Sequence, residues 1–169
     1  MSKYPLVFGL AAVVVILDQL TKWYIRQTMS LYESIAVIDS LFHITHVRNS
    51  GGAFGFLNGT HSEWRLPFFL GASSIAVAAL LGFVRRVEPQ QRALLLGLGG
   101  ILGGALGNLI DRMSSGEVTD FLDFHWHGYY FPAFNVADSC ITIGMLILIF
   151  HSLLVREPER VGDQAREQV

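Results

Sequence analysis

The chain has 169 residues, of which 51% are hydrophobic and only 15% are charged, and its mean hydropathy is +0.43. Soluble domains carry about 25% charged residues, so this composition is typical of a membrane protein. The formal net charge of -2, without a basic stripe, argues against a nucleic-acid partner.

Four apolar segments are each long enough to cross the ~30 Å hydrocarbon core of a bilayer. They cover about residues 5–25, 66–84, 93–112 and 133–155 of one membrane domain, 1–169. The first segment continues through Asp18 and Lys22 with no small-residue cleavage site, which favours a retained span over a secretory signal peptide. Glycines recur at every fourth position of the third segment, which predicts close packing against neighbouring helices.

Two connectors, at about residues 27–64 and 113–132, are more polar than the spans. Residues 35–47 are rich in β-branched and aromatic side chains with rough alternation, which predicts one or two short strands at the membrane surface. His43 and His46 would face opposite sides of such a strand. His125 and His127 would share a face of a strand but lack a carboxylate or cysteine partner, so we expect no metal site.

Basic residues near the span ends predict the orientation. One side of the membrane would hold Lys3, Arg85, Arg86, Arg92, Arg156, Arg160 and Arg166, and the other Lys22, Arg26, Arg48, Arg65 and Arg112. The positive-inside rule places the first group in the cytoplasm. Both termini, including the tail 156–169, are therefore expected to be cytoplasmic, and both connectors extracytoplasmic.

Polar side chains gather at the extracytoplasmic ends of the spans. Asp18 and Lys22 are four residues apart on one helical face and can pair, and Asn108, Asp111 and Arg112 share another helical face. Two carboxylates held close together cannot both ionise comfortably, so one keeps a proton while the other can act as a base. Aspartic-protease chemistry needs such a pair. Spacing alone does not identify the two aspartates.

Five motifs occur in order along nearly the whole chain: Asp18-Gln-Leu-Thr-Lys22, Asn49-Ser-Gly-Gly-Ala-Phe54, Gly103-Gly-Ala-Leu-Gly-Asn-Leu-Ile-Asp-Arg112, Val118-Thr-Asp-Phe121 and Phe134-Asn-Val-Ala-Asp138. Together they resemble the lipoprotein signal peptidase (signal peptidase II) family. The resemblance implies an aspartic endopeptidase of the bacterial inner membrane that removes signal peptides from diacylglyceryl-modified prolipoproteins. Cleavage would fall on the N-terminal side of the lipidated cysteine.

Matched by motif, the resemblance implies that Asp120 and Asp138 are the catalytic pair. It implies substrate-binding or supporting roles for Asp18, Lys22, Asn49, Gly51, Asn108, Arg112 and Asn135. Asp111 is expected to pair structurally, and Asp123 falls outside the motif. Gly52 departs from the usual family pattern and adds flexibility beside Asn49.

The resemblance also implies no metal or organic cofactor, a monomer in contact with membrane lipid, and inhibition by cyclic peptides of the globomycin type. The expected fold is mainly α: a four-transmembrane-helix bundle with a small extracytoplasmic β-sheet cradle and a connector loop or short helix at the membrane surface. One alternative is a small proton or ion transporter, but that function favours polar groups near the bilayer midplane. Another is a structural subunit, which would leave the layer of carboxylates and asparagines unexplained.

Overall fold

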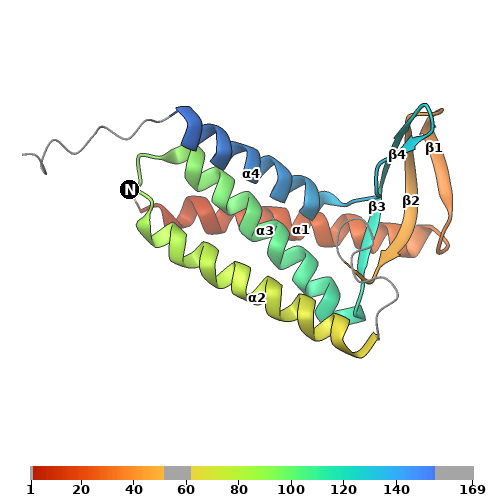
Figure 1. The fold of residues 1–169 in the computed structure, drawn as a ribbon, viewed down its shortest axis with the longest axis horizontal. Coiled ribbons are helices and arrows are strands. Elements are labelled where there is room, and N and C mark those ends of the chain that lie inside the picture. Colours follow the sequence, from red (N-terminus) through yellow and green to blue (C-terminus); the bar gives the residue numbers. More distant parts are fainter. Residues whose placement is uncertain (1, 52–61, 155–169) are drawn as a thin grey trace, which may run out of the picture.

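The computed structural model describes residues 2–51 and 62–154 (Figure 1). Its helices are α1 (Tyr4–Thr28), α2 (Ser62–Arg86), α3 (Arg92–Ser115) and α4 (Val136–Leu154), and its strands are β1 (Ser34–Ile38), β2 (Phe42–Asn49), β3 (Val118–Trp126) and β4 (Tyr129–Tyr130). All four helices are long and apolar enough to span a membrane, which confirms the expected architecture. Gly52 and the tail 156–169 lie outside the described residues.

Helix α3 is the centre of the bundle and packs against α1, α2 and α4. A Cβ atom at Gly103 would lie 2.7 Å from Val14 Cβ on α1, and one at Gly104 would collide with the carbonyl group of Ala137 on α4. Replacing hydrogen by a methyl group at either position would therefore force a neighbouring helix away. The glycine spacing has the packing role that the sequence predicts.

The outside of the bundle is apolar. Ile75 on α2 and Leu153 on α4 are each 72% exposed, and many other large hydrophobic side chains are also exposed. A soluble monomer seldom presents apolar patches of this extent, whereas lipid tails surround such a surface without penalty. The exposure of these side chains is therefore consistent with a surface that faces lipid.

The four strands form one antiparallel sheet in the order β1-β2-β3-β4, at the end of the bundle opposite the N-terminus (Figure 1). Strands β1 and β2 confirm the strands predicted within residues 35–47. Most residues of the second connector form β3 and β4. Helix α3 also continues past Asp111 to Ser115, and Gly116 ends it with a φ of 77°.

Two contacts fix the sheet on the helices. Ile25 and Met29 at the end of α1 pack with Phe121 of β3 in a buried cluster. Phe134, just before α4, exchanges backbone hydrogen bonds with Leu122 of β3, at N···O distances of 2.8 and 3.0 Å. The start of α4 is thereby held beside β3, two elements that are separated in sequence by the β3–β4 hairpin.

Candidate active site

Three charged side chains form a buried ion-pair cluster where the helices meet the sheet. Lys22 Nζ lies 2.8 Å from Asp18 Oδ2 and 3.2 Å from Asp111 Oδ2, and all three side chains are at most 1% exposed. Arg26 Nη1 adds a contact of 3.5 Å to Asp111 Oδ1. Asp18 and Lys22 thus pair as their spacing predicts, while Asp111 pairs across helices with α1. Mutual neutralisation lets these charges stay buried.

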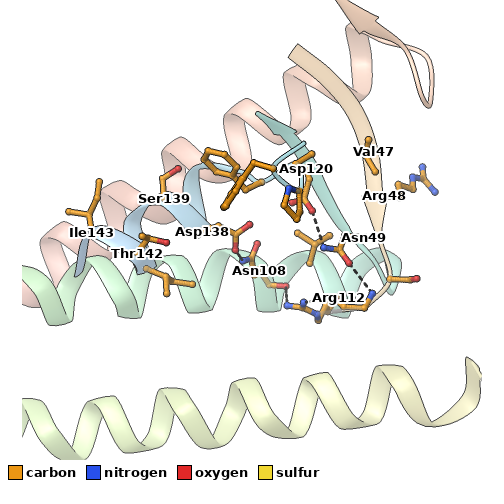
Figure 2. Close-up of a pocket in the computed structure, with 18 residues that line it drawn as sticks. Val47, Arg48, Asn49, Asn108, Arg112, Asp120, Asp138, Ser139, Thr142 and Ile143 are labelled. Atoms are coloured by element: carbon orange, nitrogen blue, oxygen red, sulfur yellow. Dashed lines mark hydrogen bonds between the residues drawn. The ribbon is translucent and has the colours of Figure 1, made fainter. Parts of the chain in front are cut away.

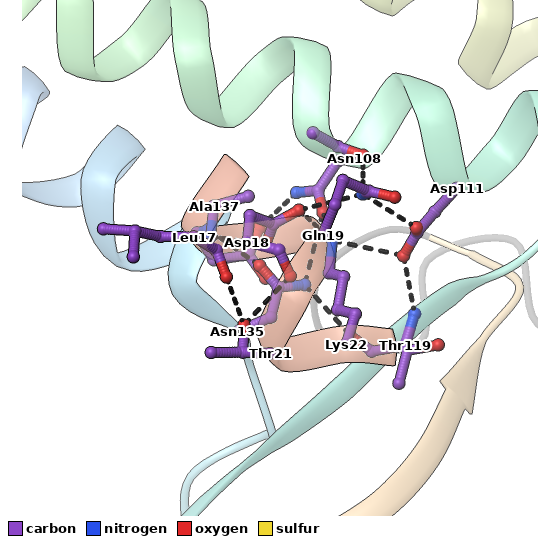
Figure 3. A network of polar contacts seen from close by, with 12 residues as sticks. Leu17, Asp18, Gln19, Thr21, Lys22, Asn108, Asp111, Thr119, Asn135 and Ala137 are labelled. Carbon is purple, nitrogen blue, oxygen red and sulfur yellow. Dashed lines mark hydrogen bonds and ion pairs between the residues drawn. The ribbon is translucent and has the colours of Figure 1, made fainter. Parts of the chain in front are cut away.

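The cluster also satisfies backbone donors of other elements (Figure 3). Asp18 Oδ1 accepts a hydrogen bond of 2.9 Å from the Ala137 N–H in the first turn of α4. Asp111 Oδ2 accepts one of 3.2 Å from the Thr119 N–H in β3. Carboxylates are favourable at helix N-termini, where N–H groups lack partners within the helix. The cluster therefore joins α1 and α3 to both α4 and β3.

Asn108, on α3, links this cluster to Asp138. Its Oδ1 accepts hydrogen bonds from Lys22 Nζ at 2.8 Å and from Asn135 Nδ2 at 3.2 Å. Because an ammonium group can only donate, the amide oxygen of Asn108 must face Lys22. The amide nitrogen consequently points the other way and donates to Asp138 Oδ1 at 2.7 Å.

Asn135 contacts both candidate catalytic aspartates. It is the N-cap of α4, and its Oδ1 accepts a hydrogen bond of 3.0 Å from the Asp138 N–H. Because that backbone group can only donate, the orientation of the amide is settled, and its Nδ2 donates to Asp120 Oδ1 at 2.7 Å. The Asn135 side chain is fully buried, so the two aspartates are held in a fixed relation.

Asp120 from β3 and Asp138 from α4 line one cavity of about 690 Å³ (Figure 2). The cavity lining combines polar residues with apolar ones, and Ser139 and Thr142 of α4 contribute hydroxyl groups to it. Its apolar lining residues include Phe131, Pro132, Phe134, Ile141 and Ile143. Ile141 and Ile143 belong to α4, a helix long and apolar enough to span a membrane, so part of the apolar lining lies on a candidate span.

The environment of Asp120 changes its acidity. Burial raises the pKa of Asp120 to about 7, and the neighbouring charge of Asp138 acts in the same direction. Hydrogen bonds from Asn49 and Asn135 favour the ionised form and oppose part of this shift. A carboxyl group with a pKa near neutrality can both hold and release a proton at physiological pH, as a general acid or base must.

The remaining predicted residues form one wall of the cavity. Asn49 Nδ2 donates to Asp120 Oδ2 at 3.1 Å, and Asn49 Oδ1 accepts the Gly51 N–H at 3.0 Å. Arg112 Nη2 lies 3.5 Å from the Gly51 carbonyl oxygen, and its guanidinium group lies 5.0 Å from the centre of the Phe69 ring. The loop after β2 is thus tied to a carboxylate on β3 and to a cation on α3.

The structure brings all the predicted site residues into the cavity wall or the network behind it. Gln19 and Arg26 join them without having been predicted. Gln19 Nε2 donates to Asp111 Oδ1 at 3.0 Å. Arg26 follows Lys22 by four residues, so helical periodicity extended by one further turn would have placed it on the same face.

The histidines differ from the expectation. His127 lies in the turn after β3, with a φ of 48°, and does not continue the strand face of His125. His43 of β2 instead lies beside Asp123 and His125 of β3. The pairing of β2 with β3, which joins segments about 80 residues apart, brings His43 beside Asp123, and Asp123 and His125 are two residues apart on β3.

Comparison with known proteins gives a consistent result. The sequence pattern of the family described as Signal peptidase (SPase) II matches residues 10–154. The chain is 44% identical over 153 residues to a lipoprotein signal peptidase of Symbiobacterium thermophilum, covering 90% of this chain and 95% of that one. It is 48% identical over 145 residues to the lipoprotein signal peptidase of Geobacter sulfurreducens, with coverage of 86% and 88%.

A solved structure supports the same relationship. A bacterial membrane enzyme determined by the in meso method at 1.9 Å resolution superposes with a TM-score of 0.77 and 38% sequence identity, covering 89% of this chain and 94% of the other. With its four membrane-spanning helices, this chain belongs to the signal peptidase II family of membrane aspartic peptidases.

Proposed function

We propose that Asp120 and Asp138 are the catalytic pair of an aspartic endopeptidase that removes signal peptides from diacylglyceryl-modified prolipoproteins, cleaving on the N-terminal side of the lipidated cysteine. The observation that carries the proposal is that both aspartates line one cavity and that the fully buried Asn135 hydrogen-bonds the Asp120 carboxylate and the Asp138 backbone N–H. The names of the relatives support the substrate class.

The chemistry follows from one proton shared by the pair. The ionised carboxylate takes a proton from a water molecule, whose oxygen attacks the scissile carbonyl carbon, and the protonated carboxyl group donates its proton to the carbonyl oxygen. A proton then passes to the amide nitrogen as the C–N bond breaks. The products are a signal peptide with a new carboxylate and a lipoprotein whose cysteine has a free α-amino group.

Neighbouring residues have positioning roles in this proposal. Asn49 and Asn135 hold Asp120 through both carboxylate oxygens, and Asn108 holds Asp138. Among the described residues no hydrogen bond reaches Asp138 Oδ2, which leaves that oxygen available for water or substrate. The Arg112 guanidinium group supplies donors at the cavity wall for carbonyl groups of a bound peptide.

The apolar part of the cavity suits a lipidated substrate. Ile141 and Ile143 of α4 line the cavity within a membrane-spanning segment. Acyl chains of a diacylglyceryl group can remain in this apolar environment while the scissile bond reaches the aspartates. We expect the substrate to arrive laterally through the bilayer and the enzyme to act as a monomer, inhibited by cyclic peptides of the globomycin type.

We also infer that the chain forms a single domain in the bacterial inner membrane, with both termini in the cytoplasm and the sheet on the extracytoplasmic side. Lys3, just before α1, donates to the carbonyl group of Arg85, so Lys3 and the basic C-terminal end of α2 lie at the same end of the bundle. The positive-inside rule assigns that end to the cytoplasm. The transporter alternative gains no support from the relatives, and the buried charges lie at one end of the spans.

The decisive experiment follows cleavage of a purified diacylglyceryl prolipoprotein and its unlipidated precursor by gel shift in detergent. Wild-type enzyme should cleave only the lipidated form, and Asp120→Asn and Asp138→Asn should cleave neither. Asp39→Asn is the matched control, because Asp39 lies exposed in the turn between β1 and β2. Cleavage at a wild-type rate by either active-site variant would refute the catalytic assignment, whereas cleavage of the unlipidated form would refute only the lipid requirement.

A further inference from the structure

We propose that the sheet carries a binding site for a divalent transition-metal cation, of which Zn²⁺ is the type case, formed by His43, Asp123 and His125. One potential ligand atom from each residue lies within 4.8 Å of the others. The site is outside the cavity that contains Asp120 and Asp138, since none of its residues lines that cavity. It belongs to neither the ion-pair cluster nor the proposed catalytic pair.

Strand pairing explains why these side chains meet. His43 of β2 is the direct antiparallel partner of Asp123 of β3. Side chains alternate between the faces of a sheet, so His125, two residues after Asp123, lies on the same face. The two imidazole rings have centroids 4.4 Å apart. Two adjacent strands therefore present two imidazoles and a carboxylate from one small area of the sheet.

The ligand set is suited to zinc. Zinc is bound by His nitrogen and Asp oxygen at about 2.0–2.2 Å, and sites with three protein ligands commonly complete a tetrahedron with water. Ligand atoms in such a tetrahedron are about 3.4 Å apart. The three ligand atoms here lie within 4.8 Å of one another, so side-chain movements of about an ångström would bring them to that spacing. Partial burial of all three residues leaves room for that movement and for a coordinated water molecule.

A neighbouring hydroxyl group helps to orient His43. Ser34 Oγ of β1 lies 3.2 Å from His43 Nδ1. A hydrogen bond at Nδ1 fixes the ring and leaves Nε2 as the nitrogen available for a cation, as partners of metal-bound histidines commonly do. A chance cluster of surface side chains would not require such a hydrogen bond, so the orientation of the His43 ring supports a binding site.

Metal binding would connect two strands that also serve the cavity. Strand β2 ends at Asn49, and Asp120 lies three residues before Asp123 on β3. A cation bound by His43 and Asp123 would bridge these strands without touching the cavity. Because an ion that binds only the folded state stabilises that state, zinc is expected to raise the melting temperature by several degrees.

The test uses the full chain without a histidine affinity tag, stripped with EDTA and purified in detergent. Titration with Zn²⁺ by isothermal calorimetry should show one ion per chain. His43→Gln, His125→Gln and Asp123→Asn should each weaken binding by at least tenfold and remove the zinc-dependent rise in melting temperature. His127→Asn is the matched control, because His127 is exposed in the adjacent turn and asparagine tolerates its positive φ.

Each outcome decides the proposal. Saturable binding by the wild type and His127→Asn, with weakened binding by the ligand variants, supports it. The proposal is overturned if the wild type shows no saturable zinc binding. It is also overturned if the His43 and His125 variants bind zinc with the same affinity as the wild type. The ligand variants alter β2 in one case and β3 in two, so misfolding of one variant does not remove the test. A monodisperse size-exclusion profile identifies the variants that are folded. Peptidase activity does not enter these readouts, so failure of the zinc site leaves the catalytic proposal intact.

Discussion

Asp18 and Asp111 form one pair of buried carboxylates at the sheet end of the bundle, and Asp120 and Asp138 form another. The first pair lies within 3.2 Å of the Lys22 ammonium group. Among residues 2–51 and 62–154, no cationic side chain lies within salt-bridge distance of the second pair, whose side chains accept hydrogen bonds from neutral amides.

We propose that this difference separates a structural pair of aspartates from a catalytic pair. An ammonium group in direct contact offsets the cost of burying an ionised carboxylate. Neutral amide groups orient a carboxylate and only partly oppose the effect of burial on its pKa. Burial therefore still raises the pKa of Asp120 to about 7. The contrast supports our proposal that the ion-pair cluster has a structural role and that Asp120 and Asp138 transfer protons.

The largest expected effect contrasts the two pairs directly. Asp120→Asn or Asp138→Asn should lower the rate of cleavage by about 10²–10⁴-fold, because a proton-transferring group is lost while the side-chain shape is kept. The melting temperature should stay near or above that of the wild type. Asp111→Asn should instead lower the melting temperature, since Lys22 and Arg26 would lose a carboxylate. If Asp111→Asn lost most of its cleavage rate but kept the wild-type melting temperature, the division into a structural pair and a catalytic pair would be contradicted.

The second prediction concerns Lys22. Lys22→Met would leave Asp18 and Asp111 buried without their shared ammonium group, and breaking such a pair costs about 3–5 kcal/mol of unfolding free energy. Denaturant titration in detergent measures this change. Arg48→Met is the comparison, because the Arg48–Glu117 contact is 3.9 Å long and partly exposed, so its loss should cost at most about 1 kcal/mol. Equal effects would show that burial does not distinguish the two ion pairs.

The third prediction is a pH dependence. Because the pKa of Asp120 is raised from 3.8 to about 7, the folded state binds more protons than the unfolded state between these values. The contribution of Asp120 to stability is thus full below pH 3.8 and lost as the pH rises through about 7. The melting temperature of the wild type should decline from pH 5 to pH 8 more steeply than that of Asp120→Asn.

The cleavage rate should depend on whether the aspartate pair retains its shared proton. Above a pH of about 7, the rate should fall roughly tenfold per pH unit as the proton leaves the pair. Asp39→Asn should keep the wild-type profile in both measurements, because Asp39 is exposed and distant in sequence from the pair. Parallel stability curves for Asp120→Asn and the wild type would contradict the link to Asp120.

The smallest expected effect tests how tightly Asp18 is enclosed. A Cβ atom at Gly107 would lie 2.5 Å from Asp18 Oδ2, so Gly107→Ala must displace the carboxylate and should cost about 1–3 kcal/mol. Gly9→Ala is a control in another helix, because a Cβ atom there has no heavy atom within 4 Å among the described residues. It should be neutral or slightly stabilising, given the better helix propensity of alanine. Thermal unfolding of both variants compares them.

Much of the fold could be predicted because it depends on local patterns. Hydropathy over about 20 residues identifies a membrane span, and a spacing of four residues places Asp18 beside Lys22. The motifs also identified the residues that gather around the cavity. Strand β3 was less accessible to prediction, because its residues need the distant strand β2 as a hydrogen-bonding partner.

The sequence by itself determined the spans, the helical faces and the set of polar residues, since these follow from chain order and side-chain chemistry. Only the tertiary structure decided that Asp111 faces Lys22, that the Asn135 amide reaches Asp120, and that His43 meets Asp123. Each of these contacts is made between side chains that local helix or strand geometry does not bring together. The charge and proton affinity of a buried group depend on such neighbours, so the roles of identical aspartates diverge only after folding.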